Sequence, residues 1–297
     1  IRFTSFICYN IYIITKGIKI MSKDHLKEFI GFGIAGNFAH HLDQAGEAAD
    51  FVNVVVEEEN APKGIFPFYL PNSDTFLGTY PLSSNTLVYP RHDDNLQMEP
   101  EVGLICELKY DGTKVIDLVP NYFTAYNDAT IRKEGASKIS QKKNWAEQTK
   151  GISSHIIPID KFEHGGIMDS YHIASFIKRN GTTHMYGQDS AVITYNYFYE
   201  KLKNWIIKKL NEQQDNGPLE DLSSHLKSCD YPTQMIISIG ATSYTDFGEN
   251  NYLKIGDECF VFIYDSNKYS LAEIEQFVKN DEILQKEDIS ILKQTII

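Results

Sequence analysis

Residues 101–120 read EVGLICELKYDGTKVIDLVP and carry the clearest β signal in the chain. The first part has the apolar and polar pattern of a half-buried strand, and it ends in Asp-Gly at positions 111–112. Asp-Gly is a preferred two-residue turn between antiparallel strands, so TKVIDLVP is expected to form the return strand. The stretch therefore predicts a β-hairpin as a central element of the fold.

Other strand-like segments lie on both sides of this hairpin, whereas helical patterns are few. Residues 60–98 are rich in turn residues with short apolar pieces between them, and QMIISIG and YLKIGDECFVFIYD are strand-like. One clear amphipathic helix lies in YNYFYEKLKNWIIKKLNEQ and is expected to cover a sheet. Its apolar side consists of Tyr195, Phe198, Leu202, Trp205, Ile206 and Leu210. This order of segments predicts a β-rich α+β fold.

Length, charge and cysteine content limit the class of protein. A chain of 297 residues can bury a full core, and we expect one main domain. The formal net charge of −12 opposes binding to nucleic acid, which requires clustered lysine and arginine, so a small polar substrate fits better. The 4 cysteines lie far apart and form no C-x-x-C pair. Reduced thiols and a cytoplasmic location are therefore expected.

The first 20 residues are apolar but carry Arg2, Lys16 and Lys19. Their uncharged run is shorter than the roughly 20 residues that a membrane span needs. No small-residue cleavage site follows them, and Met21 begins an ordinary protein start. We therefore expect residues 1–20 to be upstream translation or a loose extension, residues 21–297 to form the single domain, and no membrane partner.

Three glycines, Gly31, Gly33 and Gly36, have the G-x-G-x-x-G spacing of a dinucleotide-binding turn. That fingerprint requires a strand before it, a helix after it and an acidic residue about 20 positions further on, within a βαβ unit. Glu57 and Glu58 supply the acid, but the βαβ pattern is missing. The sequence therefore does not favour a dinucleotide site.

Glu99 and Glu101 are one residue apart in an extended segment, so both carboxylates are expected on the same face of a strand. Oxygen ligands of this kind suit Mg²⁺, Mn²⁺ or Ca²⁺. By spacing alone, the exposed polar face of an edge strand explains the pair better than a metal site does. The metal interpretation therefore needs support from residues other than Glu99 and Glu101.

Five segments resemble, in order, motifs of the fumarylacetoacetate hydrolase family, and together they span roughly residues 31–262. The first is similar to the family's G-x-N-Y-x-x-H segment, the second to its E-x-E-L strand and the third to a turn that begins with Asp and ends with Arg. The fourth is similar to its W…K-S/G segment and the fifth to its closing G-T…G-D strand pair, although Ala241 splits the Gly-Thr. The segments are GIAGNFAHHLDQAG at 33–46, EPEVGLI at 99–105, YNDATIR at 126–132, NWAEQTKG at 144–151, and SIGATS at 238–243 with the following YLKIGDECFV.

The resemblance implies the fold of that family's C-terminal domain, a mixed β-sandwich roll with few peripheral helices and a metal at its open end. It makes Asp128 the third ligand beside Glu99 and Glu101, with Mg²⁺ as the expected cofactor and Mn²⁺ or Ca²⁺ as alternatives. Lid-like segments are expected near residues 31–60 and 132–150, the second being lysine-rich and therefore a mobile loop or lid rather than core. The resemblance also implies a homodimer.

The activity implied by the resemblance is that of a hydrolase or lyase, which cleaves a carbon–carbon bond of a small oxo acid or β-dicarbonyl compound through a metal-stabilised enolate. His41 would activate water or abstract a proton, because imidazole titrates near neutrality. Lys150 would add positive charge near the enolate. The expected substrate-facing residues are Arg132, Asn37, Gln141 and Thr242.

Gln44 leaves the reaction open. The family usually pairs its hydrolytic histidine with a glutamate one helical turn later, and this chain has Gln44 at that position. An amide can orient the ring of His41 but stabilises an imidazolium less than a carboxylate does. A tautomerase, decarboxylase or dehydratase on the same metal platform is therefore an alternative. A catalytically silent protein that binds a small acid or a partner protein is another.

Overall fold

The predicted hairpin is the central element of the computed structural model, which describes residues 12–15, 18–21, 23–39, 41–47, 51, 54, 56–91, 94–133, 135–282 and 286–297. Strand β8 (Pro100–Asp111) pairs antiparallel with β9 (Lys114–Asn127), from Pro100 opposite Asn127 to Asp111 opposite Lys114. Gly112 in the turn has a φ of 59°, which glycine adopts without a Cβ clash. The hairpin is confirmed, and both strands extend beyond the stretch that predicted them.

The hairpin is the middle of a ten-stranded sheet with the main order β1-β2-β12-β9-β8-β15-β3-β4, in which β11 also pairs with β9 and β5. Strand β15 runs antiparallel to β8 and parallel to β3. Consequently the C-terminal ends of β15, β3 and β9 lie beside the beginning of β8. The remaining strands of this sheet are β1 (Tyr12–Thr15), β2 (Ile18–Met21), β3 (Ile30–Ala35), β4 (Gly64–Tyr69), β5 (Leu82–Ser83), β11 (Lys150–Ile152), β12 (His155–Pro158) and β15 (Gln234–Ser238).

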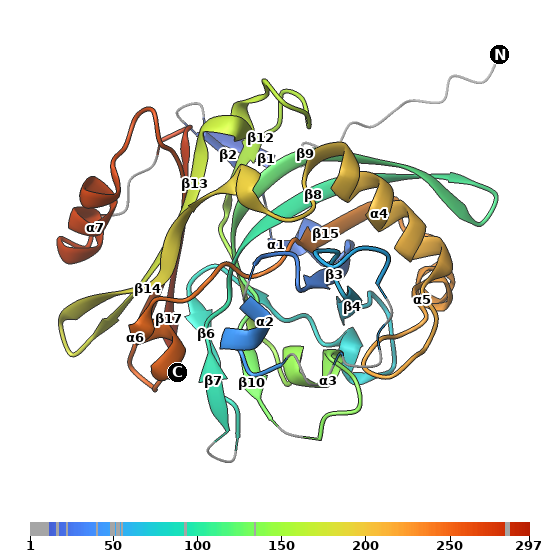
Figure 1. Ribbon diagram of the computed structural model, residues 1–297, viewed down its shortest axis with the longest axis horizontal. Coiled ribbons are helices and arrows are strands. Elements are labelled where there is room, and N and C mark those ends of the chain that lie inside the picture. Colours follow the sequence, from blue (N-terminus) through green and yellow to red (C-terminus); the bar gives the residue numbers. More distant parts are fainter. Residues whose placement is uncertain are drawn as a thin grey trace.

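A second sheet of five strands has the order β14-β13-β16-β17-β6, and a separate pair joins β10 to β7. The two larger sheets share one apolar core, because Val102, Leu104 and Phe123 of the hairpin belong to the same buried cluster as Ile173 and Val261. Figure 1 shows the two sheets curling around each other. These strands are β6 (Thr86–Leu87), β7 (Asn95–Gln97), β10 (Thr130–Arg132), β13 (Tyr171–Arg179), β14 (Thr182–Ala191), β16 (Glu258–Asp265) and β17 (Ile289–Ile296). The prediction of a β-rich α+β fold is confirmed.

Helices lie on the outside of this roll. The predicted amphipathic helix is α4 (Tyr199–Glu212), which packs against β9 through buried Leu202, Trp205 and Ile206. It begins later than the pattern suggested because Phe198 has extended backbone, although Tyr195 and Phe198 are buried ahead of it. The others described are α1 (Lys23–Leu26), α2 (His41–Gln44), α3 (Ser140–Lys143), α5 (Leu222–Ser228), α6 (Asp246–Asn250) and α7 (Leu271–Lys279), with 3-10 turns at Phe76–Gly78, Ile167–Ser170 and Val192–Thr194. None of the helices in the described ranges is both long enough and apolar enough to cross a bilayer.

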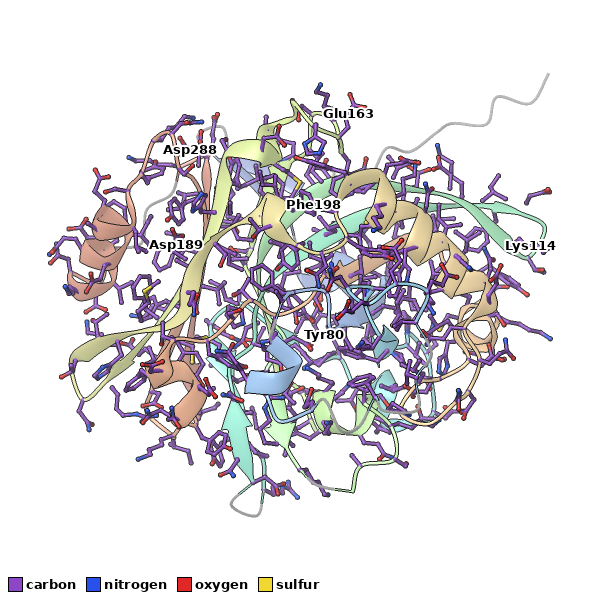
Figure 2. The ribbon with its side chains drawn as sticks, in the orientation of Figure 1. Tyr80, Lys114, Glu163, Asp189, Phe198 and Asp288 are labelled. Carbon is purple, nitrogen blue, oxygen red and sulfur yellow. The ribbon has the colours of Figure 1, made fainter. Side chains whose placement is uncertain are left out.

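Figure 2 labels residues that mark the ends of the β8–β9 hairpin and of α4. Lys114 lies at the distal end of the β8–β9 hairpin, and Phe198 lies at the start of α4. Helix α7 covers the opposite side, where Ile274 and Val278 pack on the outer face of the second sheet. The hairpin end that carries the carboxylates is thus the end away from Lys114.

Part of residues 1–20, which the sequence analysis set apart from the main domain, adds strands to the large sheet. Strands β1 and β2 form a hairpin, and β2 pairs antiparallel with β12, with Ile20 opposite His155. Residues 1–11 and 16–17 lie outside the described residues. The described part of this stretch therefore forms strands at the edge of the sheet, and the expectation of a loose extension for residues 1–20 stays a prediction.

The glycine spacing at residues 31–36 belongs to a strand and not to a nucleotide-binding turn. Gly31 and Gly33 lie within β3, and β4 crosses beside them with aromatic side chains. A Cβ at Gly33 would lie 2.4 Å from Cζ of Phe66, and one at Gly31 would lie 2.3 Å from Cε2 of Phe68. The glycines are required because these rings pack directly on the backbone of β3.

Replacing Gly33 with alanine tests this packing. We expect Gly33→Ala to lower the free energy of unfolding by about 1–3 kcal/mol, because Phe66 is buried and cannot move aside freely. Chemical denaturation measures the loss, and Phe66→Leu in the Gly33→Ala background should restore part of it by shortening the side chain. Unchanged stability of the single variant would contradict the close approach.

Candidate metal centre

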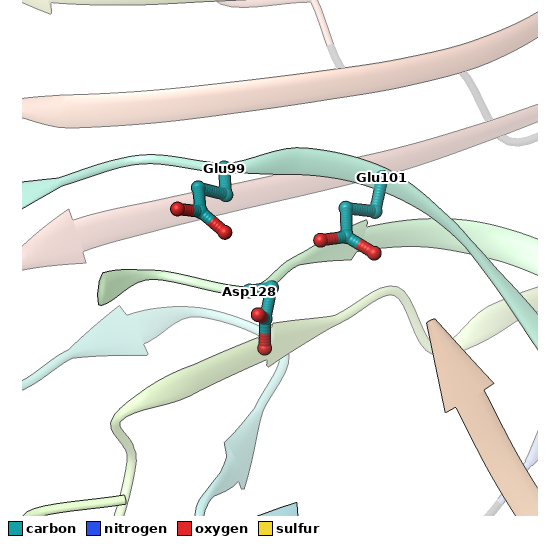
Figure 3. A group of neighbouring side chains, drawn as sticks. All are labelled: Glu99, Glu101 and Asp128. Atoms are coloured by element: carbon teal, nitrogen blue, oxygen red, sulfur yellow. The ribbon is translucent and has the colours of Figure 1, made fainter. Parts of the chain in front are cut away.

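The register of the hairpin brings together the carboxylates that the sequence singled out. Glu101 lies in β8, Glu99 directly precedes the first residue of β8, and Asp128 directly follows the last residue of β9. The backbone N–H of Asp128 donates to the carbonyl of Glu99 at 2.9 Å, so these two residues continue the pairing of the strands. All three side chains are buried, and one oxygen from each lies within 4.8 Å of the others (Figure 3). We call Glu99, Glu101 and Asp128 the carboxylate trio.

Three buried cationic side chains surround the trio. Lys143 Nζ lies 2.6 Å from Oε2 of Glu99 and 2.5 Å from Oδ2 of Asp128. Arg132 Nη2 lies 2.7 Å from Oε1 of Glu99, and Lys150 Nζ lies 2.9 Å from Oδ1 of Asp128. The predicted residues Arg132 and Lys150 are therefore at the site, and their charges offset those of the trio.

The pKa values of Glu101, Glu99 and Lys150 shift in different directions, because burial and neighbouring charges act differently on each. Burial, together with the nearby charges of Asp128 and Glu99, raises the pKa of Glu101 well above its usual value. Burial also acts on Glu99, but Lys143 and Arg132 outweigh it and hold the pKa of Glu99 well below its usual value. Burial lowers the pKa of Lys150 to about 8 in spite of the opposing charge of Asp128.

The donor atoms of the trio suit a divalent cation. Oε1 of Glu99 and both carboxylate oxygens of Asp128 are buried without a hydrogen-bond partner in the described structure, although charged groups face them. A small cavity of about 20 Å³ opens beside Glu99 and Glu101, which is space for one water-sized species. An all-oxygen set of carboxylates is typical of hard cations such as Mg²⁺, Mn²⁺ and Ca²⁺. The trio could therefore bind a metal ion.

His41 faces this cavity from α2. Its Nδ1 lies 3.0 Å from the carbonyl oxygen of Thr242, which can only accept, so Nδ1 carries the proton in this contact. In the neutral ring Nε2 is then the unprotonated nitrogen, and it lies 3.9 Å from Oε1 of Glu99. The predicted residues His41 and Thr242 are thus brought together, with the basic nitrogen directed at the trio.

Gln44 does not pair with His41. Its Oε1 accepts from the backbone N–H of Tyr244 at 2.9 Å, and its Nε2 donates to the carbonyl of Tyr244 and to Oε2 of Glu249, both at 3.3 Å. The backbone carbonyl of Thr242 takes the place beside Nδ1 of His41 that the sequence interpretation gave to Gln44. Gln44 therefore holds the segment that follows β15, and through that segment it positions His41 indirectly.

Two other predicted residues point elsewhere. The amide of Asn37 is fully engaged with backbone, because Nδ2 donates to the carbonyls of Tyr197 and Ile239 and Oδ1 accepts from the N–H of Tyr197. Gln141 accepts from the backbone N–H and the hydroxyl of Ser137 and lines a separate cavity of about 480 Å³. Asn37 thus has a structural position, and Gln141 lies outside the small cavity at the trio.

The sequence interpretation missed several residues of the site. Residues 132–150 were expected to be a mobile loop or lid rather than core, yet Lys142 and Lys143 of α3 are buried. Lys142 Nζ and Arg132 Nη1 each lie 2.8 Å from Oε1 of Glu47. The phenol of Tyr244 accepts from Nη2 of Arg132 at 3.1 Å. The only available signal was the lysine pair beside the family-like motif, and sequence spacing does not distinguish buried from solvated lysines.

Solved structures with a similar fold support the expected architecture. Cg1458 with inhibitor has a TM-score of 0.53 at 14% identity, over 90% of this chain and 76% of that chain. A 2-keto-3-deoxy-D-arabinonate dehydratase complexed with magnesium and 2,5-dioxopentanoate has a TM-score of 0.51 at 15% identity, over 90% and 72%. A protein called HpcE from Mycobacterium smegmatis has a TM-score of 0.50 at 15% identity, over 90% and 74%. The chain therefore has the fumarylacetoacetate hydrolase fold that the motifs implied.

Sequence comparison identifies a family without an assigned activity. The model of a family described as a family of unknown function (DUF5718) matches residues 47–296. A search of curated proteins gives no match. The matched segment contains the trio and Lys143, whereas His41 precedes it.

The position of Gln44 gives a prediction with a defined pH dependence. Gln44→Glu replaces a donor by a carboxylate that faces a carbonyl and Glu249, so we expect a loss of about 1–2 kcal/mol of stability at pH 7. Repulsion raises the pKa of the new carboxyl in the folded state above its unfolded value, so the folded state binds more protons. The loss relative to wild type should therefore shrink as the pH falls through that folded pKa.

Chemical denaturation at several pH values measures this loss, with Gln44→Met as the matched control. The control removes the amide without adding charge, and its loss relative to wild type should not change with pH. If Gln44→Glu is as stable as wild type at pH 7, the new carboxylate has turned away from Tyr244. That result would support the pairing of this position with His41 that the family pattern suggested.

Proposed function

The chain belongs to the family of unknown function DUF5718, and on that premise we propose that it is a divalent-metal-dependent enzyme of the fumarylacetoacetate hydrolase superfamily that acts on a small oxo acid. One observation carries this proposal: a buried carboxylate trio with a histidine whose Nε2 lies 3.9 Å from Oε1 of Glu99. Burying several carboxylates and cations together is costly, and such a cluster beside a histidine is typical of a catalytic site.

Each residue has a role in this proposal. Glu99, Glu101 and Asp128 would hold the cation, which when bound supplies a Lewis acid that polarises the oxo oxygen of the substrate. Nε2 of His41 takes or delivers a proton beside the trio, while the carbonyl of Thr242 keeps the proton of the ring on Nδ1. Lys150, whose pKa burial lowers to about 8, supplies positive charge beside Asp128 at 2.9 Å.

Arg132 is less free to bind substrate than the sequence suggested. Its Nε donates to Gln97 at 2.7 Å, Nη1 donates to Glu47 at 2.8 Å, and Nη2 contacts Glu99 at 2.7 Å. These partners hold the guanidinium against the trio from one side. Arg132 is therefore proposed to orient Glu99 and to set the charge of the site, and substrate contact would require it to give up one of these partners.

The reaction that we propose first is the carbon–carbon cleavage typical of the superfamily. The contact between His41 and Thr242 favours a second candidate, because a carbonyl stabilises an imidazolium less than a carboxylate does. A decarboxylase, tautomerase or dehydratase needs a proton to be moved but does not require an activated water. The similar structure of a dehydratase with magnesium and 2,5-dioxopentanoate supports this second candidate by analogy of fold.

Metal binding is the first test of the proposal. Wild-type protein freed of metal with a chelator should bind Mg²⁺ or Mn²⁺, and calorimetry measures the affinity. Glu101→Gln should weaken binding by roughly tenfold or more, because it removes one anionic ligand. Glu220→Gln is a matched control, since Glu220 is also largely buried but accepts from Ser140 outside the trio. No binding to wild type at millimolar Mn²⁺ would rule out the metal-dependent enzyme.

Turnover is the second test. We expect His41→Gln to keep the metal affinity of wild type and to reduce turnover by roughly 10²–10⁴-fold, because only proton transfer is removed. Assays of acylpyruvate hydrolysis, oxaloacetate decarboxylation and dehydration of a 2-keto-3-deoxy sugar acid separate the two candidate reactions. Equal turnover in His41→Gln and wild type would show that His41 does not handle the proton.

A further inference from the structure

The ammonium of Lys143 lies where a cation shared by Glu99 and Asp128 would lie. Three oxygens lie at close range to its nitrogen: Oε2 of Glu99 at 2.6 Å and the hydroxyl of Thr130 accept hydrogen bonds from it, and Oδ2 of Asp128 forms an ion pair with it at 2.5 Å. The side chain is only 3% exposed, so water does not replace these contacts. Two of the three acceptors belong to the trio. Lys143 thus serves as an internal cation for two of the carboxylates that could hold a metal, and it contacts one oxygen of each.

A metal ion and this ammonium cannot bind these oxygens together. Mg²⁺ binds its oxygen ligands at about 2.0–2.1 Å, so an ion bridging Glu99 and Asp128 would lie within roughly a bond length or two of Nζ. Two positive charges at that separation in a buried site repel strongly. An ion that uses Oε2 of Glu99 and Oδ2 of Asp128 also needs the acceptor atoms of Lys143, so each cation removes ligands from the other. Occupation of the site must therefore alternate between the two cations.

We propose that Lys143 is a built-in competitor of the metal, whose ammonium neutralises the carboxylate trio until a divalent cation displaces it. This inference rests on the proposed function, because it takes the trio to be the metal site. It adds that the chain itself sets how much free metal is needed to load the site. A site with this competitor takes up the ion only where the ion is abundant, and in the absence of metal the ammonium adds to the compensation that Arg132 and Lys150 give the buried carboxylates.

The moving part is the side chain and not the helix. Helix α3 is anchored at one end by Ser140, whose hydroxyl donates to Glu220 at 2.9 Å. At the other end, Asn144 donates to the carbonyls of Phe68 and Thr79, both at 2.9 Å. Lys143 reaches the trio through a four-carbon stem with several rotatable bonds. Exchange therefore requires rotation of that stem, while the backbone of α3 stays in place.

The neighbouring Lys142 offers a matched control. It is also buried, it lies on the same helix, and its ammonium pairs with Glu47 at 2.8 Å. Lys142→Met removes one buried positive charge close to the trio but leaves Lys143 in contact with Glu99 and Asp128. A difference between Lys143→Met and Lys142→Met thus measures direct competition for the ligands and separates it from the general loss of positive charge.

The experiment is a calorimetric titration of chelator-treated protein with Mn²⁺ alone. Lys143→Met should bind Mn²⁺ on the order of tenfold to a hundredfold more tightly than wild type, whereas Lys142→Met should change the affinity by less than about threefold. If wild type binds Mn²⁺ and Lys143→Met binds it no more tightly, competition is refuted and the metal-dependent function stands. If neither protein binds Mn²⁺, both the proposed function and this inference fail.

A second variant covers the case in which Lys143→Met does not fold, since it leaves the trio less compensated. Thr130→Val removes the third acceptor of the ammonium and keeps the volume of the side chain and all three carboxylates. It should tighten Mn²⁺ binding by a few-fold, because it removes one acceptor of the Lys143 ammonium. It also removes the donation of the Thr130 hydroxyl to the backbone carbonyl of Asp128 at 3.0 Å, which leaves the carboxylate of Asp128 unchanged. Unchanged or weaker affinity in Thr130→Val would overturn the proposal independently of Lys143→Met.

Discussion

The antiparallel register between β8 and β9 is the constraint on which both the fold and the site depend. It places Glu101 opposite Tyr126, and its continuation places Glu99 opposite Asp128, so the alternation of side chains puts all three carboxylates on one face. A slip by one residue would direct these carboxylates to the opposite face, which is packed with Val102 and Leu104. The apolar pattern that selects the core face therefore also selects the face of the charged site.

The local sequence pattern was sufficient to predict the central hairpin and the helix that covers it. The Asp-Gly turn with flanking strands predicted β8 and β9, and the apolar spacing around Leu202 predicted the helix that covers them. Expecting carboxylates at 99, 101 and 128 to lie together required the family resemblance, because by spacing alone an exposed strand explains Glu99 and Glu101 better than a metal site does. Whether the trio binds a metal remains a prediction, and the geometry is consistent with it.

What the sequence did not reveal depends on contacts between distant segments. The lysine-rich stretch around Lys143 has few apolar residues and therefore resembles a solvated loop, but acidic partners elsewhere in the chain make its burial possible. The helical offset from His41 to Gln44 suggested that these two side chains pair, but Nδ1 of His41 instead contacts the carbonyl of Thr242. Similarly, Asn37 lies in a motif-like segment, yet its amide is used to join backbone segments. Tertiary contacts of this kind are not encoded in spacing along the chain.

The bond between His41 and Thr242 joins residues that are 201 positions apart in the sequence. Gln44 reaches Tyr244 and Glu101 accepts from Gly240, so the last contributor to the site is translated long after the first. A nascent chain that has completed the hairpin already carries the three carboxylates, but it lacks the segment that fixes the base. Completion of the site is therefore a late event in synthesis, because the segment that contacts His41 emerges long after the three carboxylates.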